Sequence, residues 1–223
     1  MNKESSIMAP AGLSDNLREV TVGRPEVNIR IDGNVTYLHA VEPLQPYPDR
    51  LLDCLVHWAD VRAQQTFLAQ RDATAQWQHI TYAQMLKRTR SIAQSLLSFG
   101  LSVDRPLVLL SGNDLEHLQL ACAALYAGIP YCPVSPAYSL VSKDYGKLRH
   151  VIQTLEPGLV FAADERFAGA IRAVVDSDIP LILTRGNFVE RCCVQFSSLL
   201  QPADIAEADA AFAATGPESI AKF

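Results

Sequence analysis

The chain has 223 residues, of which 49% are hydrophobic and 19% are charged, a balance typical of globular proteins and not of disordered ones. Its formal net charge is -5, and its cations are scattered among acidic residues. A nucleic-acid-binding domain, which needs a basic stripe to neutralise phosphates, is therefore disfavoured. The length suits one domain of ordinary size.

The cysteines and the N-terminus indicate where the protein works. The five cysteines are an odd number and contain no C-x-x-C pair, which argues against zinc and thioredoxin-type sites and fits a reducing compartment. Residues 1–21 are polar and mixed in charge, so we expect a flexible leader and no signal peptide. No stretch approaches the roughly 18 apolar residues of a membrane span. We expect a soluble, cytoplasmic protein that has neither nucleic acid nor membrane as a partner.

The first predicted elements are short strands and one helix. Val27, Ile29 and Ile31 alternate with polar residues, residues 32–34 supply a turn, and the alternation resumes at Val35, which predicts a β-hairpin. A proline-rich stretch then precedes a predicted helix with the apolar residues Leu51, Leu52, Leu55, Val56 and Ala59. Residues 66–69 and 77–80 are further strand candidates.

The strongest helix signal begins at Thr81. Thr81 and Gln84 have the spacing of a capping box, in which each side chain bonds a backbone N–H at the helix start. Apolar residues follow at helical spacing, and Gly100 is the expected stop because glycine accepts a positive φ.

From residue 107 onward, apolar runs alternate with helical patterns. Strands are expected at 107–110, 130–134, 159–162 and 181–183, and helices at 114–127, around 148–155 and at 165–175, with a loop at 135–139. The helix at 114–127 is expected to bury one face that contains Leu115, Leu118, Cys122 and Leu125. Continuous apolar strands separated by helices predict an α/β fold, a mostly parallel sheet with helices on both faces.

The pattern weakens after Arg185. Residues 203–214 are rich in alanine but poorly amphipathic, which leaves a surface helix and a linker as alternatives. Ser219 to Phe223 begins a further element.

One strand-to-helix turn is a candidate anion site. Residues 111–114 read Ser-Gly-Asn-Asp, and the free N–H groups at such a turn can bind phosphate. The turn has a single glycine, so it meets neither the dinucleotide fingerprint nor the phosphate-loop pattern. We therefore favour a structural role, in which Asn113 or Asp114 caps the following helix.

The other candidate residues also favour structural roles. His57, His79, His117 and His150 lack metal-ligand spacing, and Glu116–His117 is interpreted as a solvated pair on a helix. Cys192–Cys193 has no activating cluster beyond Arg191, and the cations of residues 143–150 suit a solvated helix face. No G-x-S-x-G elbow occurs. The residues themselves thus predict no catalytic, cofactor-binding or metal-binding residue.

Three stretches together resemble the adenylate-forming superfamily, which includes acyl-CoA and aryl-CoA synthetases, luciferase and peptide-synthetase adenylation domains. They are residues 80–101, which read I-T-Y-A-Q-M and end in F-G-L, residues 104–136 and residues 148–161. Gln84 stands where the family commonly has Glu. The middle stretch carries the family pattern at Asn113, Glu116, Ala124, Ala127, Gly128, Pro133, Val134 and Pro136.

Other segments are similar to feruloyl-CoA synthetases in particular. These segments are residues 47–51, 55–59, 66–71 and 133–142. The resemblance runs from about residue 24 to residue 223. It implies that residues 22–223 are a partial AMP-binding domain, the N-terminal subdomain of the adenylate-forming fold preceded by the hairpin.

The resemblance also implies an activity for a full-length member. ATP and Mg²⁺ convert a carboxylic acid, here an aromatic one, into an acyl-adenylate, and CoA then displaces AMP. The family uses a Ser/Thr/Gly-rich phosphate loop, an aromatic-Gly-x-Ser/Thr-Glu segment, an Asp for the ribose and a late Lys. None of these occurs in the sequence, although residues 219–223 resemble the start of the strand before the loop.

We therefore expect an N-terminal ligase fragment, cut before the phosphate loop and inactive alone, to which the resemblance assigns no catalytic, cofactor or metal residue. The alternative is a non-catalytic module that pairs with a separately encoded remainder, a complementing C-terminal fragment. A nucleotide-binding α/β domain of another kind is disfavoured because the glycine fingerprint is missing.

Overall fold

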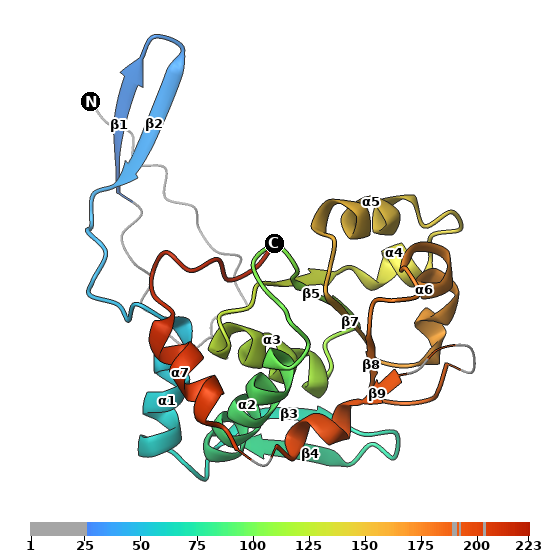
Figure 1. Ribbon diagram of the computed structural model, residues 1–223. Coiled ribbons are helices and arrows are strands. Elements are labelled where there is room, and N and C mark those ends of the chain that lie inside the picture. The colour runs from blue at the N-terminus through green and yellow to red at the C-terminus, as the bar shows by residue number, and fades with distance from the viewer. Residues whose placement is uncertain (1–25, 189–190, 192, 203) are drawn as a thin grey trace, which may run out of the picture. The chain divides into compact units, whose positions relative to one another are not determined.

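The computed structural model describes residues 26–188, 191, 193–202 and 204–223 (Figure 1). The leader predicted for residues 1–21 and Cys192 lie outside the described residues. The chain divides into two compact units, one ending at Tyr47 and one spanning Pro48–Phe223. Among the described residues, no helix is both long and apolar enough to cross a membrane.

The first unit contains the predicted hairpin, formed by β1 (Val27–Asp32) and β2 (Val35–Ala40). Gly33 has a φ of +59° at the turn, a conformation that glycine adopts without steric cost. The register pairs Ile29 with Leu38 and Arg30 with Tyr37. Since directly opposed residues share a face, one face is apolar, and the guanidinium of Arg30 lies over the Tyr37 ring on the other.

The second unit is built around a parallel sheet. Its strands and helices are α1 (Leu51–Val61), β3 (Thr66–Arg71), β4 (Trp77–Thr81), α2 (Tyr82–Leu97), β5 (Leu107–Leu110), α3 (Leu115–Tyr126), β6 (Tyr131–Val134), α4 (Pro136–Leu140), α5 (Gly146–Leu155), β7 (Leu159–Ala162), α6 (Ala168–Val174), β8 (Leu181–Leu183), β9 (Cys193–Gln195) and α7 (Ala206–Ala214). The order of the main sheet is β6-β5-β7-β8-β9, and every pairing in it is parallel. Strands β3 and β4 pair antiparallel as a separate sheet.

Both faces of the main sheet are covered. Leu107, Leu109 and Phe161 pack toward α2 and α3. Their neighbours in the same strands, Val108 and Leu110, pack toward α5 and α6. Figure 1 shows these helix pairs on opposite sides of the strands. The continuous apolar runs exist because every side chain of β5 is buried on one face or the other, which confirms the predicted α/β fold.

Helix α2 begins as the sequence predicts. Thr81 Oγ1 accepts a hydrogen bond from the Gln84 backbone N–H at 3.3 Å, and Gln84 Oε1 accepts one from the Thr81 N–H at 3.0 Å. This confirms the capping box, with a glutamine serving where glutamate is common. The stop is confirmed as well, because Gly100 has a φ of +65° just beyond the helix.

Three local predictions need correction. Helix α3 buries far more than one face, including Gln119, because it lies between the sheet, α2 and α7. The expected loop at 135–139 is helix α4, in which Pro136 occupies the first helical position that suits its fixed φ. The helix expected at 165–175 starts as a 3₁₀ turn over Glu165–Phe167 and continues as α6.

Strand β9 was not predicted at all. It has three residues and adds to β8 at the edge of the sheet. Arg191 donates hydrogen bonds to the carbonyl oxygens of Val175, Asp176 and Ile179, which holds the segment before β9 against the loop between α6 and β8. A 3₁₀ helix follows over Phe196–Leu200.

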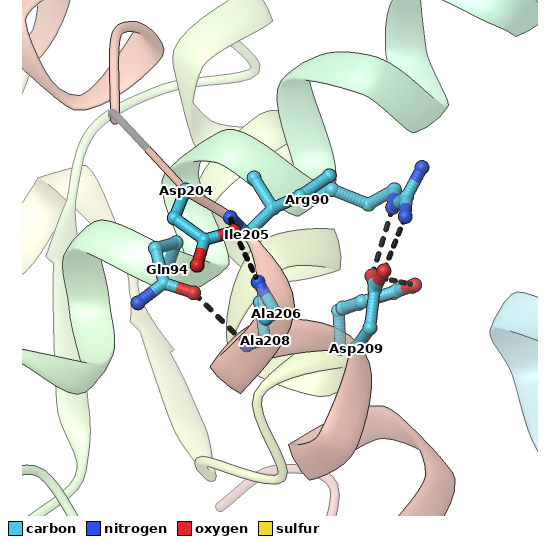
Figure 2. A network of polar contacts seen from close by, with 8 residues as sticks. Arg90, Gln94, Asp204, Ile205, Ala206, Ala208 and Asp209 are labelled. Carbon is cyan, nitrogen blue, oxygen red and sulfur yellow. Dashed lines mark hydrogen bonds and ion pairs between the residues drawn. The ribbon is translucent and has the colours of Figure 1, made fainter.

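Residues 206–214 form helix α7, which removes the linker alternative for them. The helix packs against α2 and α3 through the apolar side chains of Ala208 and Phe212 and through a network of polar contacts (Figure 2). Arg90 of α2 makes a two-pronged contact with Asp209, which also accepts a hydrogen bond from Tyr126 Oη at 2.9 Å. Gln94 accepts from the Ala208 N–H at 3.0 Å, and Asp204 accepts from the Ala206 N–H at 3.1 Å at the helix start.

The final residues run along the outer edge of β6. The Tyr131 N–H donates to the Ala221 carbonyl at 3.3 Å, and the Phe223 N–H donates to the Tyr131 carbonyl at 3.1 Å. A parallel bridge therefore joins Tyr131 and Lys222. The segment that the sequence marks as the start of a further element lies beside the sheet.

Candidate functional site

The strand order places a candidate site at the carboxyl ends of β5 and β7. The chain leaves β5 to form β6 on one side and returns to form β7 on the other. In open parallel sheets, ligands bind outside the carboxyl ends of the strands where the order reverses in this way. Residues 111–114 follow β5, and Asp164 follows shortly after β7.

Ser111, which is buried, and His117, which is half-buried, form a polar pair at this edge. Ser111 is only 3% exposed, and its Oγ lies 2.8 Å from His117 Nδ1, one turn into α3. Desolvation lowers the pKa of His117, so its neutral form is favoured at pH 7. The interpretation of Glu116–His117 as a solvated pair is therefore wrong for His117. The distance suits a nucleophile and base, but the burial of Ser111 closes its hydroxyl to a substrate.

The start of α3 is capped by a side chain from another element. Gln70 of β3 accepts a hydrogen bond from the Leu115 N–H and donates one to the Asn113 carbonyl, both at 3.2 Å. Asp114 occupies the N-cap position, but its side chain makes no capping hydrogen bond. Its Oδ2 is buried without a hydrogen-bond partner. The prediction is right about the N-cap position, which Asp114 occupies, and wrong about the side-chain hydrogen bond, which Gln70 makes instead. The glutamine also occupies one of the N–H groups that a phosphate would need.

Asp164 forms the other half of the edge. It is buried, and its carboxylate accepts hydrogen bonds from the Arg166 backbone N–H at 3.1 Å, from Nε at 2.9 Å and from Nη2 at 2.8 Å. Arg185 Nη2 lies 3.6 Å away. The Arg166 contacts lower the pKa of Asp164. Its carboxylate therefore holds the chain between β7 and α6, and its contacts are already made within the protein.

The other candidate residues lie on other elements. His57 packs edge-on to Trp58, and His79 lies 3.3 Å from Thr66 Oγ1. Lys147 and Arg149 are exposed on α5, which confirms the solvated face. Cys122 is buried, and burial raises its pKa to about 12. Across the part of the chain that the structure describes, no group of three or more His, Cys, Asp or Glu side chains could hold a metal ion.

Sequence reasoning missed Gln70 and the Asp164–Arg166 contact. Gln70 precedes Leu115 by 45 residues, so no local sequence pattern predicts that it caps the helix. Asp164 did carry a signal, since Asp is a preferred N-cap residue directly before a helix.

We expect Gln70→Ala to lower the free energy of unfolding by about 1 kcal/mol, the typical cost of a lost cap. Gln78→Ala is the matched control, because Gln78 is the cross-strand partner of Gln70 in β4 and bonds no helix start. Asp114→Ala should cost less than Gln70→Ala, because Asp114 makes no capping bond. Urea unfolding of the three variants measures this. Equal losses for Gln70→Ala and Gln78→Ala would contradict the assignment of the cap.

Comparison with known proteins identifies the fold and the family. A scan against protein-family models matches the family described as "AMP-binding enzyme" over residues 55–220. This range contains the whole main sheet and nearly all of the helices around it. A search of the curated proteins found no significant match.

Several solved structures have a similar fold. VinN aligns with 24% identity and a TM-score of 0.55 over 79% of this chain and 42% of its own. The fatty acyl-adenylate ligase from L. pneumophila, solved with acyl adenylate and pyrophosphate, aligns with 18% identity and a TM-score of 0.54 over 78% and 27%. A benzoate CoA ligase from Burkholderia xenovorans LB400 aligns with 19% identity and a TM-score of 0.57 over 78% of this chain and 32% of its own. The chain thus spans less than half the length of these structures, to whose N-terminal part it corresponds.

Proposed function

The chain belongs to the AMP-binding enzyme family, and from this premise we propose that it is the N-terminal part of an ATP-dependent acid–CoA ligase of the feruloyl-CoA synthetase type. The observation that carries the proposal is the family match over residues 55–220. The matched range contains every strand of the parallel sheet in the second unit. The proposed reaction forms an acyl-adenylate from an aromatic carboxylic acid and ATP, with Mg²⁺, and then transfers the acyl group to CoA.

Residues 133–142 support the choice of an aromatic acid. This segment is similar to feruloyl-CoA synthetases, and it covers the end of β6 and all of α4. It therefore lies at the carboxyl edge of the sheet, where ligands of open parallel sheets bind. Tyr138 within it packs beneath the Lys147 ammonium, 5.2 Å from the ring centroid. Such a contact fixes the tyrosine ring at this edge.

We assign these residues a structural contribution and no catalytic step. The described residues do not fit ATP phosphates at the candidate edge, because Gln70 occupies the start of α3 and Arg166 occupies Asp164. The phosphate loop, the aromatic-Gly-x-Ser/Thr-Glu segment and the late Lys do not occur among the 223 residues. In this proposal, the chain supplies a rigid sheet and its covering helices, and the groups that contact nucleotide lie in other sequence.

The second candidate, a module that pairs with a separately encoded remainder, has one observation in its favour. Within the described residues, the outer edge of β6 is paired only by the bridge at Tyr131. The next residue of β6 that faces this edge is Pro133, whose carbonyl can accept a hydrogen bond from an added strand but which has no N–H to donate. Strand addition to an open edge is a common mode of association. Co-purification with a polypeptide that carries the phosphate loop would distinguish this candidate from a single-chain ligase.

Reconstitution tests the proposed activity. We would fuse residues 1–223 to the remaining sequence of a feruloyl-CoA synthetase and measure thioester formation with ferulate, benzoate and a fatty acid. The expected result is a ligase that prefers ferulate, with the remainder alone as the inactive control. A folded fusion that forms no adenylate would contradict the ligase assignment. A fusion that prefers benzoate would contradict only the feruloyl assignment, and a fusion that prefers the fatty acid would contradict the choice of an aromatic acid.

A further inference from the structure

The hairpin of the first unit has open edges and lies outside the family match, which begins at residue 55. Among the described residues, β1 and β2 pair with each other and with no further strand. A two-stranded sheet on its own is marginally stable in water, so an added strand would stabilise it. We propose that the open edge of β2 pairs antiparallel with β2 of a second copy of the chain, which makes a four-stranded sheet and a dimer.

One face of the hairpin is apolar along its length. Ile29 and Leu38 lie opposite each other on this face and are 63% and 68% exposed. Ile31 lies on the same face and is 71% exposed. The other face is polar and carries the ion pair between Arg30 and Asp32. When the sheet continues beyond β2, the apolar side chains of the added strand lie beside those of β2 and remove part of their surface from water.

The hydrogen-bond pattern of the hairpin decides which backbone groups of β2 point outward. The Val41 N–H donates to the Glu26 carbonyl at 3.1 Å, so these two residues form a hydrogen-bonded pair. Hydrogen-bonded and non-hydrogen-bonded pairs alternate along an antiparallel ladder. The N–H and C=O groups that β2 turns away from β1 are therefore those of Thr36, Leu38 and Ala40. Such a row of unpaired groups is the template for strand addition.

A twofold axis at Leu38 gives the pairing its register. Leu38 then lies opposite Leu38 of the second copy, and Thr36 of each copy lies opposite Ala40 of the other, so every outward N–H of β2 meets an outward carbonyl. Tyr37 lies opposite His39. Because opposed residues share a face, the apolar faces of the two hairpins lie on the same side of the sheet. The interface uses the same patch on both chains, as the commonest homodimers do.

Charge selects the edge of β2 over the outer edge of β1. Residues 35–41 contain no Asp, Glu, Lys or Arg, so two copies of β2 oppose no like charges. Two copies of β1 paired about the middle of the strand would oppose Glu26 to Asp32, and a shift by half a residue would oppose Arg30 to itself. A register centred on Ile31 is cut short by the turn. Like charges directly opposed destabilise a sheet, and β2 lacks the charges that commonly protect an edge strand.

Sedimentation equilibrium of the 223-residue chain at a series of concentrations tests the proposal. The unmodified chain should show a monomer–dimer equilibrium. Leu38→Lys places two like charges opposite each other at the twofold axis, and it should raise the dimer dissociation constant by at least about tenfold. Ile29→Lys is the matched control, because Ile29 is the cross-strand partner of Leu38 on the same apolar face but lies on β1. It should change the dissociation constant by less than about twofold.

Proline substitutions at outward positions are the second arm. Thr36→Pro removes an outward N–H of β2, and Ile31→Pro removes the outward N–H directly across from it on β1. Neither breaks a hydrogen bond between the two strands, because proline is tolerated where the N–H of an edge strand faces solvent. Thr36→Pro should abolish the dimer, and Ile31→Pro should preserve it. Three results would each overturn the proposal: a monomeric unmodified chain, a dimer that survives Leu38→Lys and Thr36→Pro, or equal losses for the two members of either matched pair.

Discussion

Replacing Phe161 by alanine should lower the free energy of unfolding by about 3 to 5 kcal/mol, the usual cost of removing a fully buried phenylalanine. Phe161 lies in β7, between β5 and β8, and its side chain is 0% exposed. It contacts the apolar layer between the sheet, α2 and α3, and its ring centroid is 6.3 Å from that of Phe196. The substitution leaves a cavity that the surrounding strands and helices cannot close.

Urea unfolding followed by far-UV circular dichroism measures this loss. Phe161→Leu should cost less, because it keeps most of the buried volume. Val61→Ala, at an exposed position at the end of α1, should stay within about 0.5 kcal/mol of the unmodified chain. A loss below about 1 kcal/mol for Phe161→Ala would show that the packing around β7 is not as described.

Separating α7 from α2 should have the second largest effect. Arg90→Leu removes the two-pronged contact with Asp209 and leaves that carboxylate with the Tyr126 hydroxyl alone. Both side chains of the ion pair are more than a third exposed, so solvent screens the interaction and the expected loss is about 1 to 2 kcal/mol. A double-mutant cycle with Asp209→Asn isolates the pair. An interaction free energy near zero would contradict a stabilising role for it.

The same pair predicts a pH dependence. The hydrogen bonds from Arg90 lower the pKa of Asp209 below the value of about 3.9 that an unfolded Asp has. Its contribution to stability is complete above that value and is lost as the pH falls through the lower folded-state pKa. Arg90 and Tyr126 are the charged and titratable groups that contact Asp209, and Arg90 stays charged throughout. Measured by thermal unfolding, the stability difference between the unmodified chain and Asp209→Asn should therefore stay constant from about pH 6 to about pH 4 and shrink as the pH is lowered further.

The sheet could be predicted where its own residues carry the signal. Strands β5, β7 and β8 are uninterrupted apolar runs because both of their faces are buried. The start of α2 was predictable because a capping box is a local pattern that depends on residues three apart. The stop at Gly100 follows from a backbone conformation that glycine favours.

The features that sequence reasoning missed depend on distant partners. Strand β9 has three residues with half-buried or exposed side chains, and only its pairing with β8 makes it a strand. Helix α7 has no amphipathic stripe that would predict it. It is held in place by polar and stacking contacts with Arg90, Gln94 and Tyr126. Gln70 caps α3 from another sheet. Periodicity and spacing carry no information about such contacts.

The candidate edge shows the same division. The order of the residues shows that a polar turn follows β5. It does not show which side chains surround Ser111 and Asp114. The turn brings Ser111 to His117 and leaves Asp114 Oδ2 without a partner. The turn lies at the start of α3, a helix that contacts both β3 and β6.

Under the proposed function, these residues are the N-terminal part of an adenylate-forming ligase, and the groups that perform adenylation lie outside residues 1–223. ATP–pyrophosphate exchange with ferulate, measured on the purified 223-residue chain, tests it most directly. We predict no exchange above the protein-free blank, and ferulate-dependent exchange once residues 1–223 are joined to sequence that carries the phosphate loop. Clear ferulate-dependent exchange by the purified chain alone would contradict the claim.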